Sequence, residues 1–255
     1  MKTLPASDDF HSGAALSFAF ISVDSLERSL DFYRSVIGLT AQAVSSGTCV
    51  LACDDGVARP ARPALLAEPG TAVGRILLIE FADRGVPVRR PGDRTTRGFW
   101  NLNFYVNDIE ASTRVLRARG LEFWSDPATY RVGTDAGIAT EVVFEGPDSV
   151  AINLVDPQGE ADTFTGRVRA QVACHGKTPM GFTPVATSAH CVRDVKAALG
   201  FYRDVLGMQV VLDEYLGSPE TNRFLARPAA ARTHTIFVAG SHFFGKVALN
   251  EPQNF

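Results

Sequence analysis

The sequence lacks a hydrophobic run of the about 20 apolar residues that a membrane-spanning helix needs. It also shows no apolar core of a secretory signal, because residues 1–13 include two aspartates and a histidine. Cysteine is scarce, and the four cysteines form neither a CxxC pair nor a dense framework, which argues against a disulfide scaffold. Reduced thiols are the default in the cytoplasm, so the cysteines and the missing signal predict a cytoplasmic protein. Because no hydrophobic run is long enough to span a membrane, we also expect no membrane partner.

A charge excess of either sign is missing as well. Lys and Arg number 25 and Asp and Glu number 28, which gives a net charge of −3 and an isoelectric point near 6.0. A near-neutral chain lacks the basic surface of a nucleic-acid-binding protein, so we expect no nucleic-acid partner. With 45% hydrophobic residues the composition is that of a globular protein, and 255 residues allow one large domain or two small ones.

What the chain does contain is a repeated segment. Residues 32–39 read FYRSVIGL and residues 201–208 read FYRDVLGM. A β-like run precedes each copy, and a capping residue follows that run, Ser25 or Asp194, whose side chain can accept hydrogen bonds from the first free amides of a helix. The glycine within each motif ends the helix, as a left-handed residue after the last turn requires.

A third, weaker copy lies between these two. NLNFYV (101–106) reads as its strand, Asp108 as its cap and Gly120 as its helix stop. Further β-like segments follow each helix, such as GLEFW (120–124) in the middle copy, so every copy reads β-α-β-β-β. The copies define modules 1, 2 and 3 at residues 15–83, 98–156 and 181–252. Residues 85–97 and 157–179 read as linkers, and the second is long, polar and typical of an interdomain connection.

The capped helix that ends in FYRxVxG and the turn-strand GPDSVAINL (146–154) together resemble the vicinal oxygen chelate superfamily, which includes glyoxalase I, bleomycin-resistance proteins and extradiol dioxygenases. The resemblance implies an α+β fold in which two βαβββ modules pair into an open, curved, eight-stranded barrel around a cleft. We expect modules 1 and 2 to pair in this way over residues 15–158. Module 3, at 181–252, is then unpaired within the chain, and it would pair with a fourth module beyond Phe255 or with a second chain. A homodimer through module 3 is our prediction.

The resemblance also implies a divalent metal, usually held by His on the first strand and Glu on the last strand of each module. The first-strand positions, seven residues before each cap, hold Phe18, Asn101 and Thr187, and the last-strand positions hold Glu80, Asn153 and Ala248. A catalytic Zn, Ni or Fe ion needs about three strong nitrogen, sulfur or carboxylate ligands, and only one of these residues qualifies. We therefore expect no metal and no cofactor. The alternative is a metal-dependent lyase or extradiol-type dioxygenase with shifted ligands.

Strand alternation predicts which side chains line the cleft. It selects an apolar surface with a few polar groups, as is common in small-molecule sites. The ligand-binding candidates are Phe18, Phe20, Asn101, Asn103, Tyr105 and Asn153. We expect the ligand to be a small aromatic or apolar molecule with a carbonyl or phenolic group.

Glu80 is the candidate general base. A carboxylate at the floor of a metal-free cleft loses hydration, which raises its pKa and allows proton exchange near neutral pH. Two alternatives remain open: Glu80 only fills the old metal site, hydrogen-bonded to Asn101 and Asn153, or the protein sequesters its ligand without turnover. Side chains at the cleft mouth can stack on the ligand or offer a charge, although core packing is the more ordinary role for aromatic residues in strands. These side chains are Trp100, Trp124, Tyr130 and Arg131.

Overall fold

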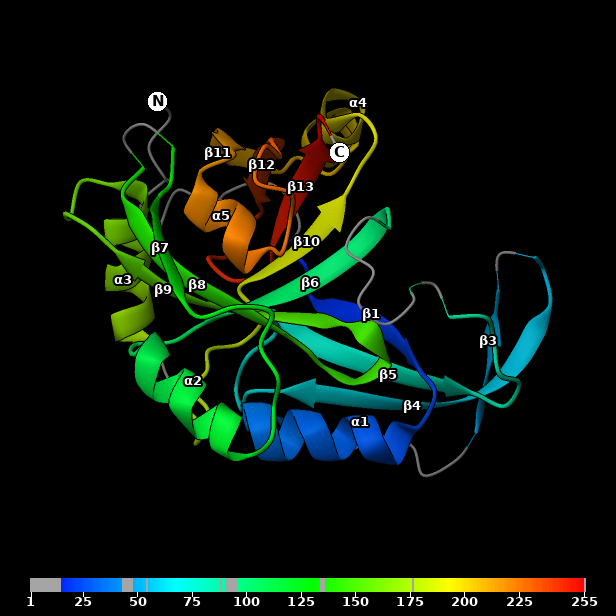
Figure 1. Ribbon diagram of the computed structural model, residues 1–255. Coiled ribbons are helices and arrows are strands. Elements are labelled where there is room, and N and C mark those ends of the chain that lie inside the picture. Colours follow the sequence, from blue (N-terminus) through cyan, green and yellow to red (C-terminus); the bar gives the residue numbers. More distant parts are fainter. Residues whose placement is uncertain are drawn as a thin grey trace.

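Strands from the three modules form two separate sheets in the computed structural model (Figure 1). The structure describes residues 15–42, 48–53, 55–87, 89, 96–133, 136–175 and 177–254. No helix in these ranges is long and apolar enough to cross a membrane. Of the first predicted linker, 85–97, the structure describes only residues 85–87, 89, 96 and 97.

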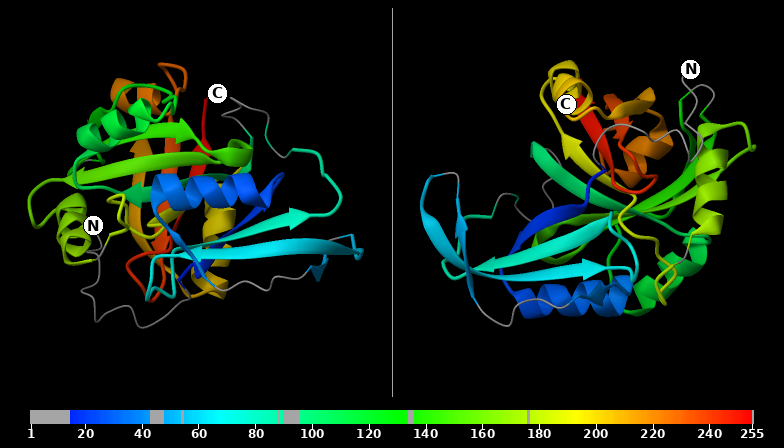
Figure 2. Two further views of the ribbon diagram at one scale, coloured as in Figure 1. Left: turned by 90° about the horizontal axis from the view of Figure 1, so that it is seen from below. Right: turned by 180° about the vertical axis from the view of Figure 1, so that it is seen from behind.

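Module 1 alone forms the smaller sheet, sheet A. Its strands lie in the order β1-β5-β4-β2, with β3 paired to β4. Their bounds are β1 Phe18–Val23, β2 Thr40–Ala41, β3 Cys49–Ala52, β4 Ala58–Ala67 and β5 Arg75–Phe81. The β3–β4 arm extends away from the rest of the molecule (Figure 2).

Modules 2 and 3 together form the larger sheet, sheet B, an open and strongly curled half-barrel of eight strands in the order β11-β12-β13-β10-β6-β9-β8-β7. Module 2 contributes β6 Gly98–Tyr105, β7 Ala128–Arg131, β8 Ile138–Glu145 and β9 Ala151–Gln158. Module 3 contributes β10 Thr187–Cys191, β11 Gln209–Leu216, β12 Thr233–Ala239 and β13 Lys246–Pro252. The two halves join where β6 and β10, the first strands of their modules, pair antiparallel.

The predicted fold class, an α+β chain of βαβββ modules with two paired into an open eight-stranded sheet, is confirmed. The expected choice of partners is wrong, because modules 2 and 3 pair and module 1 remains separate. A dimer through an unpaired module 3 therefore has no free first strand to use. The three modules share one sequence pattern, so the pattern alone does not distinguish their partners.

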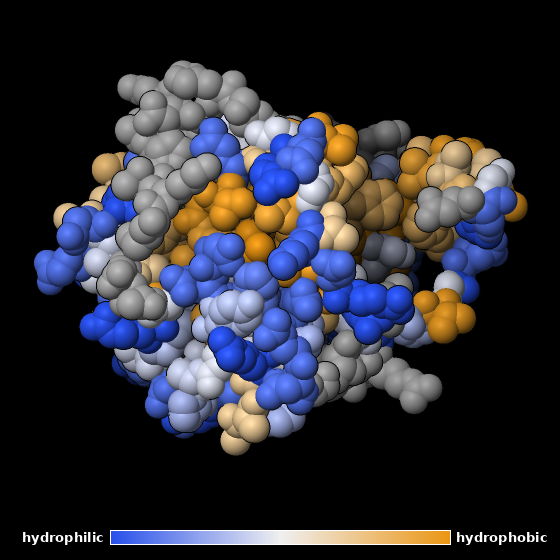
Figure 3. Space-filling model, turned by 90° about the horizontal axis from the view of Figure 1, so that it is seen from above, coloured by the Kyte–Doolittle hydropathy of each residue, from blue (hydrophilic) through white to orange (hydrophobic). Residues whose placement is uncertain are grey.

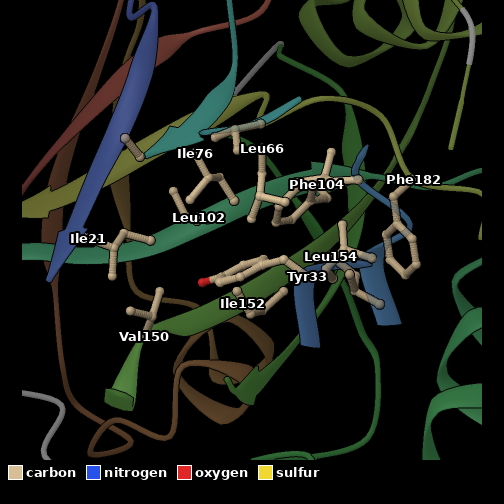
Figure 4. Close-up of a cluster of buried hydrophobic side chains, with 14 of the residues drawn as sticks. Ile21, Tyr33, Leu66, Ile76, Leu102, Phe104, Val150, Ile152, Leu154 and Phe182 are labelled. Atoms are coloured by element: carbon tan, nitrogen blue, oxygen red, sulfur yellow. The ribbon is translucent and has the colours of Figure 1, made fainter. Parts of the chain in front are cut away.

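Module 1 instead packs its helix-bearing side against the helix-bearing side of module 2. One core joins Ile21 and Tyr33 of module 1 to Leu102, Phe104 and Ile152 of module 2, and all five side chains are buried (Figure 4). Helices α1, Leu26–Phe32, and α2, Ile109–Ala118, lie along the same side of the molecule (Figure 1). This apolar contact fixes module 1 on the convex side of sheet B.

A polar contact at the turn Pro147–Ser149 holds the same two modules together. The Asp148 carboxylate accepts hydrogen bonds from the backbone amide of Asp24 at 3.0 Å, the guanidinium of Arg28 at 2.8 Å and the hydroxyl of Ser29 at 2.9 Å. These donors come from the loop before α1 and the first turns of α1, where an anion is favoured.

The predicted helix caps are confirmed. Ser25 and Asp108 accept hydrogen bonds from the amides of Arg28 and Ala111, and Asp194 caps α4, Val195–Gly200, in the same way. Helices α1 and α4 each widen into a π-helical turn at the repeated motif, η2 Tyr33–Ile37 and η4 Phe201–Val205.

Two helices were not expected from the sequence. Helix α3, Phe164–Cys174, occupies the segment read as a polar linker, and α5, Pro219–Phe224, lies between β11 and β12. GLEFW (120–124) does not form a strand and contributes only a bridge from Phe123 to Phe144, while β7 begins at Ala128. Both helices contribute to the walls of the cavity described next.

Candidate functional site

A cavity lies between modules 2 and 3, and its empty space, including the part that is open to solvent, is about 800 Å³. Its walls come from β6 to β13, from α3 and from α5 and the residues that follow it. On the face seen from above, where α5 and module 3 lie, hydrophobic side chains gather inside a hydrophilic rim (Figures 1 and 3). Aromatic side chains supply much of the apolar lining, namely Trp100, Tyr105, Tyr130, Phe164, Phe224 and Phe237.

Three asparagines on neighbouring strands form the polar part of this lining. Asn101 and Asn103 alternate along β6, and Asn153 lies opposite Asn103 on β9, so all three point to the same face. All three are buried, and the side-chain oxygen of each has no hydrogen-bond partner among the described residues. The indole N–H of Trp100, beside Asn101, is buried and unpartnered in the same way. An unpaired buried acceptor or donor costs about 1–3 kcal/mol, so this group of atoms is suited to a ligand with polar hydrogens.

A buried carboxylate, Glu141 on β8, organises one side of the site. The hydroxyl of Tyr130 donates to Glu141 Oε1 at 2.7 Å, and the amide of Asn153 donates to Oε2 at 2.6 Å. Burial raises the pKa of Glu141, and the hydrogen bonds from Asn153 and Tyr130 oppose that rise. The sequence offered a signal for this residue, a charged side chain inside the apolar strand 138–145, two positions after Ala139 on the same face.

The tyrosines of the lining are protonated at neutral pH. Burial raises the pKa of Tyr130 and of Tyr105 above the ordinary tyrosine value, and the nearby Glu141 carboxylate raises both further. The Tyr130 ring stacks on Phe224 with 5.5 Å between ring centroids. Both phenols are therefore neutral parts of the wall.

Arg227, which follows α5, brings a positive charge to the wall. Its guanidinium carbon lies 5.0 Å from the centre of the Trp100 ring, an arrangement that favours cation–π attraction. Burial lowers the pKa of Arg227 to about 10, so it remains charged at neutral pH. No feature of the sequence identified this residue, because α5 was not expected.

Of the predicted site residues, the structure brings together the four in module 2. Asn101, Asn103, Tyr105 and Asn153 all line the cavity. Among the side chains considered for the mouth, Trp100 and Tyr130 line it, and Trp124 packs on Trp100 with 6.1 Å between ring centroids. Arg131 is exposed and is not part of the lining.

The predicted residues of module 1 lie elsewhere. Phe18 and Phe20 lie on the open face of sheet A, where they are 38% and 52% exposed. Glu80 lies on the opposite, helix-covered face of sheet A, beside Val23, and its carboxylate accepts a hydrogen bond from Arg62 at 2.8 Å. The structure thus does not bring Glu80 together with Asn101 and Asn153.

The reason for the misplacement of Glu80 is a shift along the last strand. In module 2, Asn103 lies five residues before the helix cap, and Asn153 lies opposite it on the last strand. In module 1, Phe20 lies five residues before its cap, and the residue opposite it is Leu77. Glu80 lies three residues beyond Leu77, and an odd shift along a strand moves a side chain to the other face.

The residues at the family's metal positions do not fit a catalytic transition metal. Asn101, Asn153, Thr187 and Ala248 meet in the cavity, and none of them offers an imidazole, a thiolate or a carboxylate. Both carboxylate oxygens of Glu141 already accept hydrogen bonds. Within the part of the chain that the structure describes, no three His, Cys, Asp or Glu side chains are grouped closely enough to hold a metal ion. Such a donor set does not offset the desolvation of Zn, Ni or Fe.

Comparisons with solved structures identify similar folds. Two variants of glyoxalase I from Zea mays superpose with TM-scores of 0.59 and 0.60, at 15% and 14% identity, covering 98% of this chain and 73% of theirs. Another glyoxalase I structure from Zea mays gives a TM-score of 0.58 at 14% identity, covering 94% of this chain and 68% of the other. At such low identity the likeness shows the fold alone.

Comparison with curated proteins gives no significant match to the sequence. The family model of the Glyoxalase/Bleomycin resistance protein/Dioxygenase superfamily, however, matches residues 15–154, more than half of the chain. Together with the βαβββ modules and the curled eight-stranded sheet, this match shows that the chain belongs to the Glyoxalase/Bleomycin resistance protein/Dioxygenase superfamily.

Proposed function

We propose that the cavity between modules 2 and 3 binds a small aromatic molecule that carries a phenolic hydroxyl or an amide N–H. The observation that carries this proposal is the group of three buried, unpaired asparagine oxygens in an aromatic-walled cavity. The superfamily fold is compatible with glyoxalase-like or dioxygenase-like activity. The neutral donor set at the metal positions favours a metal-independent role.

The orientation of Asn153 specifies which end of the ligand it recognises. Its NH₂ group donates to Glu141 at 2.6 Å, so its oxygen is directed away from that carboxylate and acts as an acceptor. A ligand O–H or N–H satisfies this oxygen, while a bare carbonyl does not. The Trp100 N–H, by contrast, can donate to an oxygen of the ligand. A phenolic hydroxyl meets both demands, because it donates one hydrogen bond and accepts another.

A thermal-shift screen with matched ligand pairs tests this proposal. Each pair consists of a phenol and its methyl ether, which have the same aromatic body but differ in the donated hydrogen. A ligand at about 100 times its Kd stabilises the folded state by about 2.7 kcal/mol. We expect phenols to raise the melting temperature and their ethers to have a much smaller effect. Equal effects of both members, or no effect of any phenol, would contradict the proposal.

A second candidate function is metal-independent proton transfer with Glu141 as the acid or base. It is favoured by one observation: Glu141 lines the cavity and burial raises its pKa toward the range useful for catalysis. Incubation of a bound ligand in D₂O separates the two functions, because a proton-transfer enzyme introduces deuterium at carbon. Deuterium uptake that is lost in Glu141→Gln supports the enzyme, and an unlabelled ligand supports the binding protein.

A further inference from the structure

Arg227 places a guanidinium group in the wall of the cavity, where its carbon lies 5.0 Å from the centre of the Trp100 ring. These two side chains form what we call the Trp–Arg corner. The other charged residue type in the described lining is Glu141, whose two oxygens accept hydrogen bonds from the wall itself. Burial lowers the pKa of Arg227 to about 10, so desolvation outweighs the attraction of its surroundings, yet the group stays charged at neutral pH. A desolvated cation of this kind is stabilised by an anion that enters the cavity.

Trp100 reaches this corner through a bulge in β6. On β10, Ala189 lies opposite Asn101. The next residue of β10 lies opposite Phe99, so Trp100 is an extra residue on β6. A bulge of this kind re-aims side chains: Trp100 and Asn101 both line the cavity although they are consecutive, whereas Phe99 packs on the core shared by modules 1 and 2. The bulge thus brings a buried indole, whose N–H has no hydrogen-bond partner among the described residues, to the cavity.

Arg227 reaches the same corner through an unusual end of helix α5. Ala226 has a φ of +49°, in the left-handed region where glycine is the usual residue after a helix. The amide of Ala226 donates to the carbonyl of Arg223 at 3.0 Å, and the amide of Arg227 donates to the carbonyl of Asn222 at 2.8 Å. These bonds turn the chain directly before Arg227. A left-handed residue that has a side chain is strained, and such strain is concentrated where proteins hold ligands.

Two further arginines add positive charge near the Trp–Arg corner. Burial raises the pKa of the Cys191 thiol, and the charges of Arg227, Arg97 and Arg89 oppose that rise, so all three lie near one thiol. Arg89 also donates to the backbone carbonyl of Trp100 at 2.9 Å. A part of a wall that carries charge of one sign attracts a ligand of the opposite sign.

We propose that Arg227 binds a carboxylate of the ligand, so that the cavity takes an aromatic acid with a phenolic hydroxyl. This inference rests on the proposed function and adds a charge to the ligand. A guanidinium presents parallel N–H donors that match the two oxygens of a carboxylate, and such a pair is stronger in a cavity than in water. A carboxylate has no hydrogen to donate, so it suits Arg227, while the hydroxyl suits the asparagine oxygens.

Calorimetric titration of the full chain at pH 7 tests this inference with the hydroxybenzoate isomers and the methyl ester of each. Acid and ester share the ring and the hydroxyl, but only the acid is negatively charged. We expect at least one acid to bind about tenfold or more tightly than its ester. Esters that bind as tightly as their acids would overturn the inference and leave the proposed function intact. Failure of every acid and ester to bind would contradict both.

Substitution of Arg227 tests its role directly, after a check that each variant melts cooperatively. We expect Arg227→Met to weaken binding of the acid about tenfold to a hundredfold and that of the ester far less. Arg227→Lys keeps the charge without the planar donors and should recover part of the loss. Arg223→Met, at an exposed position of α5, is the control and should bind the acid as wild type does. Equal losses for acid and ester in Arg227→Met would overturn the inference.

Benzoate, which lacks the hydroxyl, separates this inference from the proposed function. We expect it to bind more weakly than the best hydroxybenzoate and to lose further affinity in Arg227→Met, which would support both. Benzoate that binds as tightly as every hydroxybenzoate, and does so only when Arg227 is present, would support the carboxylate site and contradict the recognition of a phenol. Benzoate binding that Arg227→Met leaves unchanged would contradict the carboxylate site.

Discussion

The side-chain amide of Asn153 donates a hydrogen bond to the buried carboxylate of Glu141, with 2.6 Å between Nδ2 and Oε2. This hydrogen bond determines which end of the Asn153 side chain faces the cavity. In the proposed function it links Glu141, whose pKa is raised by burial, to the recognition of a ligand. Tyr130 donates to the other oxygen of the same carboxylate at 2.7 Å. The three residues form one hydrogen-bonded unit on the wall, and the predictions below follow from it and from its surroundings.

Replacement of Glu80 by Gln should leave ligand binding unchanged. Glu80 lies on the helix-covered face of sheet A, where it interacts with Arg62, and it is not part of the cavity lining. An ion pair between partly exposed groups contributes about 0–1 kcal/mol, so the melting temperature should fall only slightly. Calorimetric titration of wild type and Glu80→Gln with the same phenol checks this. A large loss of affinity would mean that Glu80 contributes to the site.

Glu141 should make the protein less stable as the pH rises. Its pKa is raised in the folded state from the ordinary value of 4.5, mainly by burial, so the folded chain holds its proton to higher pH than the unfolded chain does. Stability from this group is complete below pH 4.5 and declines as the pH rises from there through the raised folded pKa. Urea unfolding across this range should show a smaller decline for Glu141→Gln. Glu122→Gln, at an exposed position of the same module, should retain the wild-type slope.

Lys246 should act in the opposite direction and at higher pH. This side chain is 1% exposed, donates to the carbonyl of Phe243 at 2.6 Å and lies over the rings of Phe243 and Tyr105. Burial lowers its pKa from 10.5 to about 7. Between these values the unfolded chain binds the extra proton, so stability rises with pH by up to about 1.4 kcal/mol per unit.

The Lys246→Met variant should lose this rise between pH 7 and 10.5. Lys196→Met, which removes an exposed lysine of the same module, serves as the control and should keep it. Unfolding free energies from urea titrations at several pH values provide the measurement. Parallel profiles for wild type and Lys246→Met would show that the amine is charged in the folded state.

The sequence predicts the part of the cavity lining that module 2 supplies, because strand alternation is a local rule. Asn101, Asn103, Tyr105 and Asn153 follow from a period of two along β6 and β9, and the helix caps follow from Ser25, Asp108 and Asp194. The choice of paired modules did not follow, because it depends on which apolar faces pack together over long distances in the chain. Tyr33 packs on Leu102 and Phe104, and no local pattern encodes that contact.

Other parts of the site were missed for specific reasons. The sequence predicts a linker where helix α3 lies, because the polar residues of this segment mask the few apolar ones that face the cavity, such as Phe164 and Val168. The sequence predicts the wrong face for Glu80, because this residue lies three positions beyond Leu77 on β5. The prediction from sequence does not include Glu141, although a carboxylate inside an apolar strand is a recognisable signal.

The central claim is that the oxygen of Asn153 accepts a hydrogen from the ligand, and a four-way calorimetric comparison tests it most directly. The affinities of one phenol and of its methyl ether are measured for wild type and for Asn153→Leu, after a check that the variant melts cooperatively. We predict that the substitution weakens binding of the phenol about tenfold or more and changes that of the ether far less, because only the phenol loses a hydrogen bond. Equal losses for both ligands, or none for either, would contradict this account of the site.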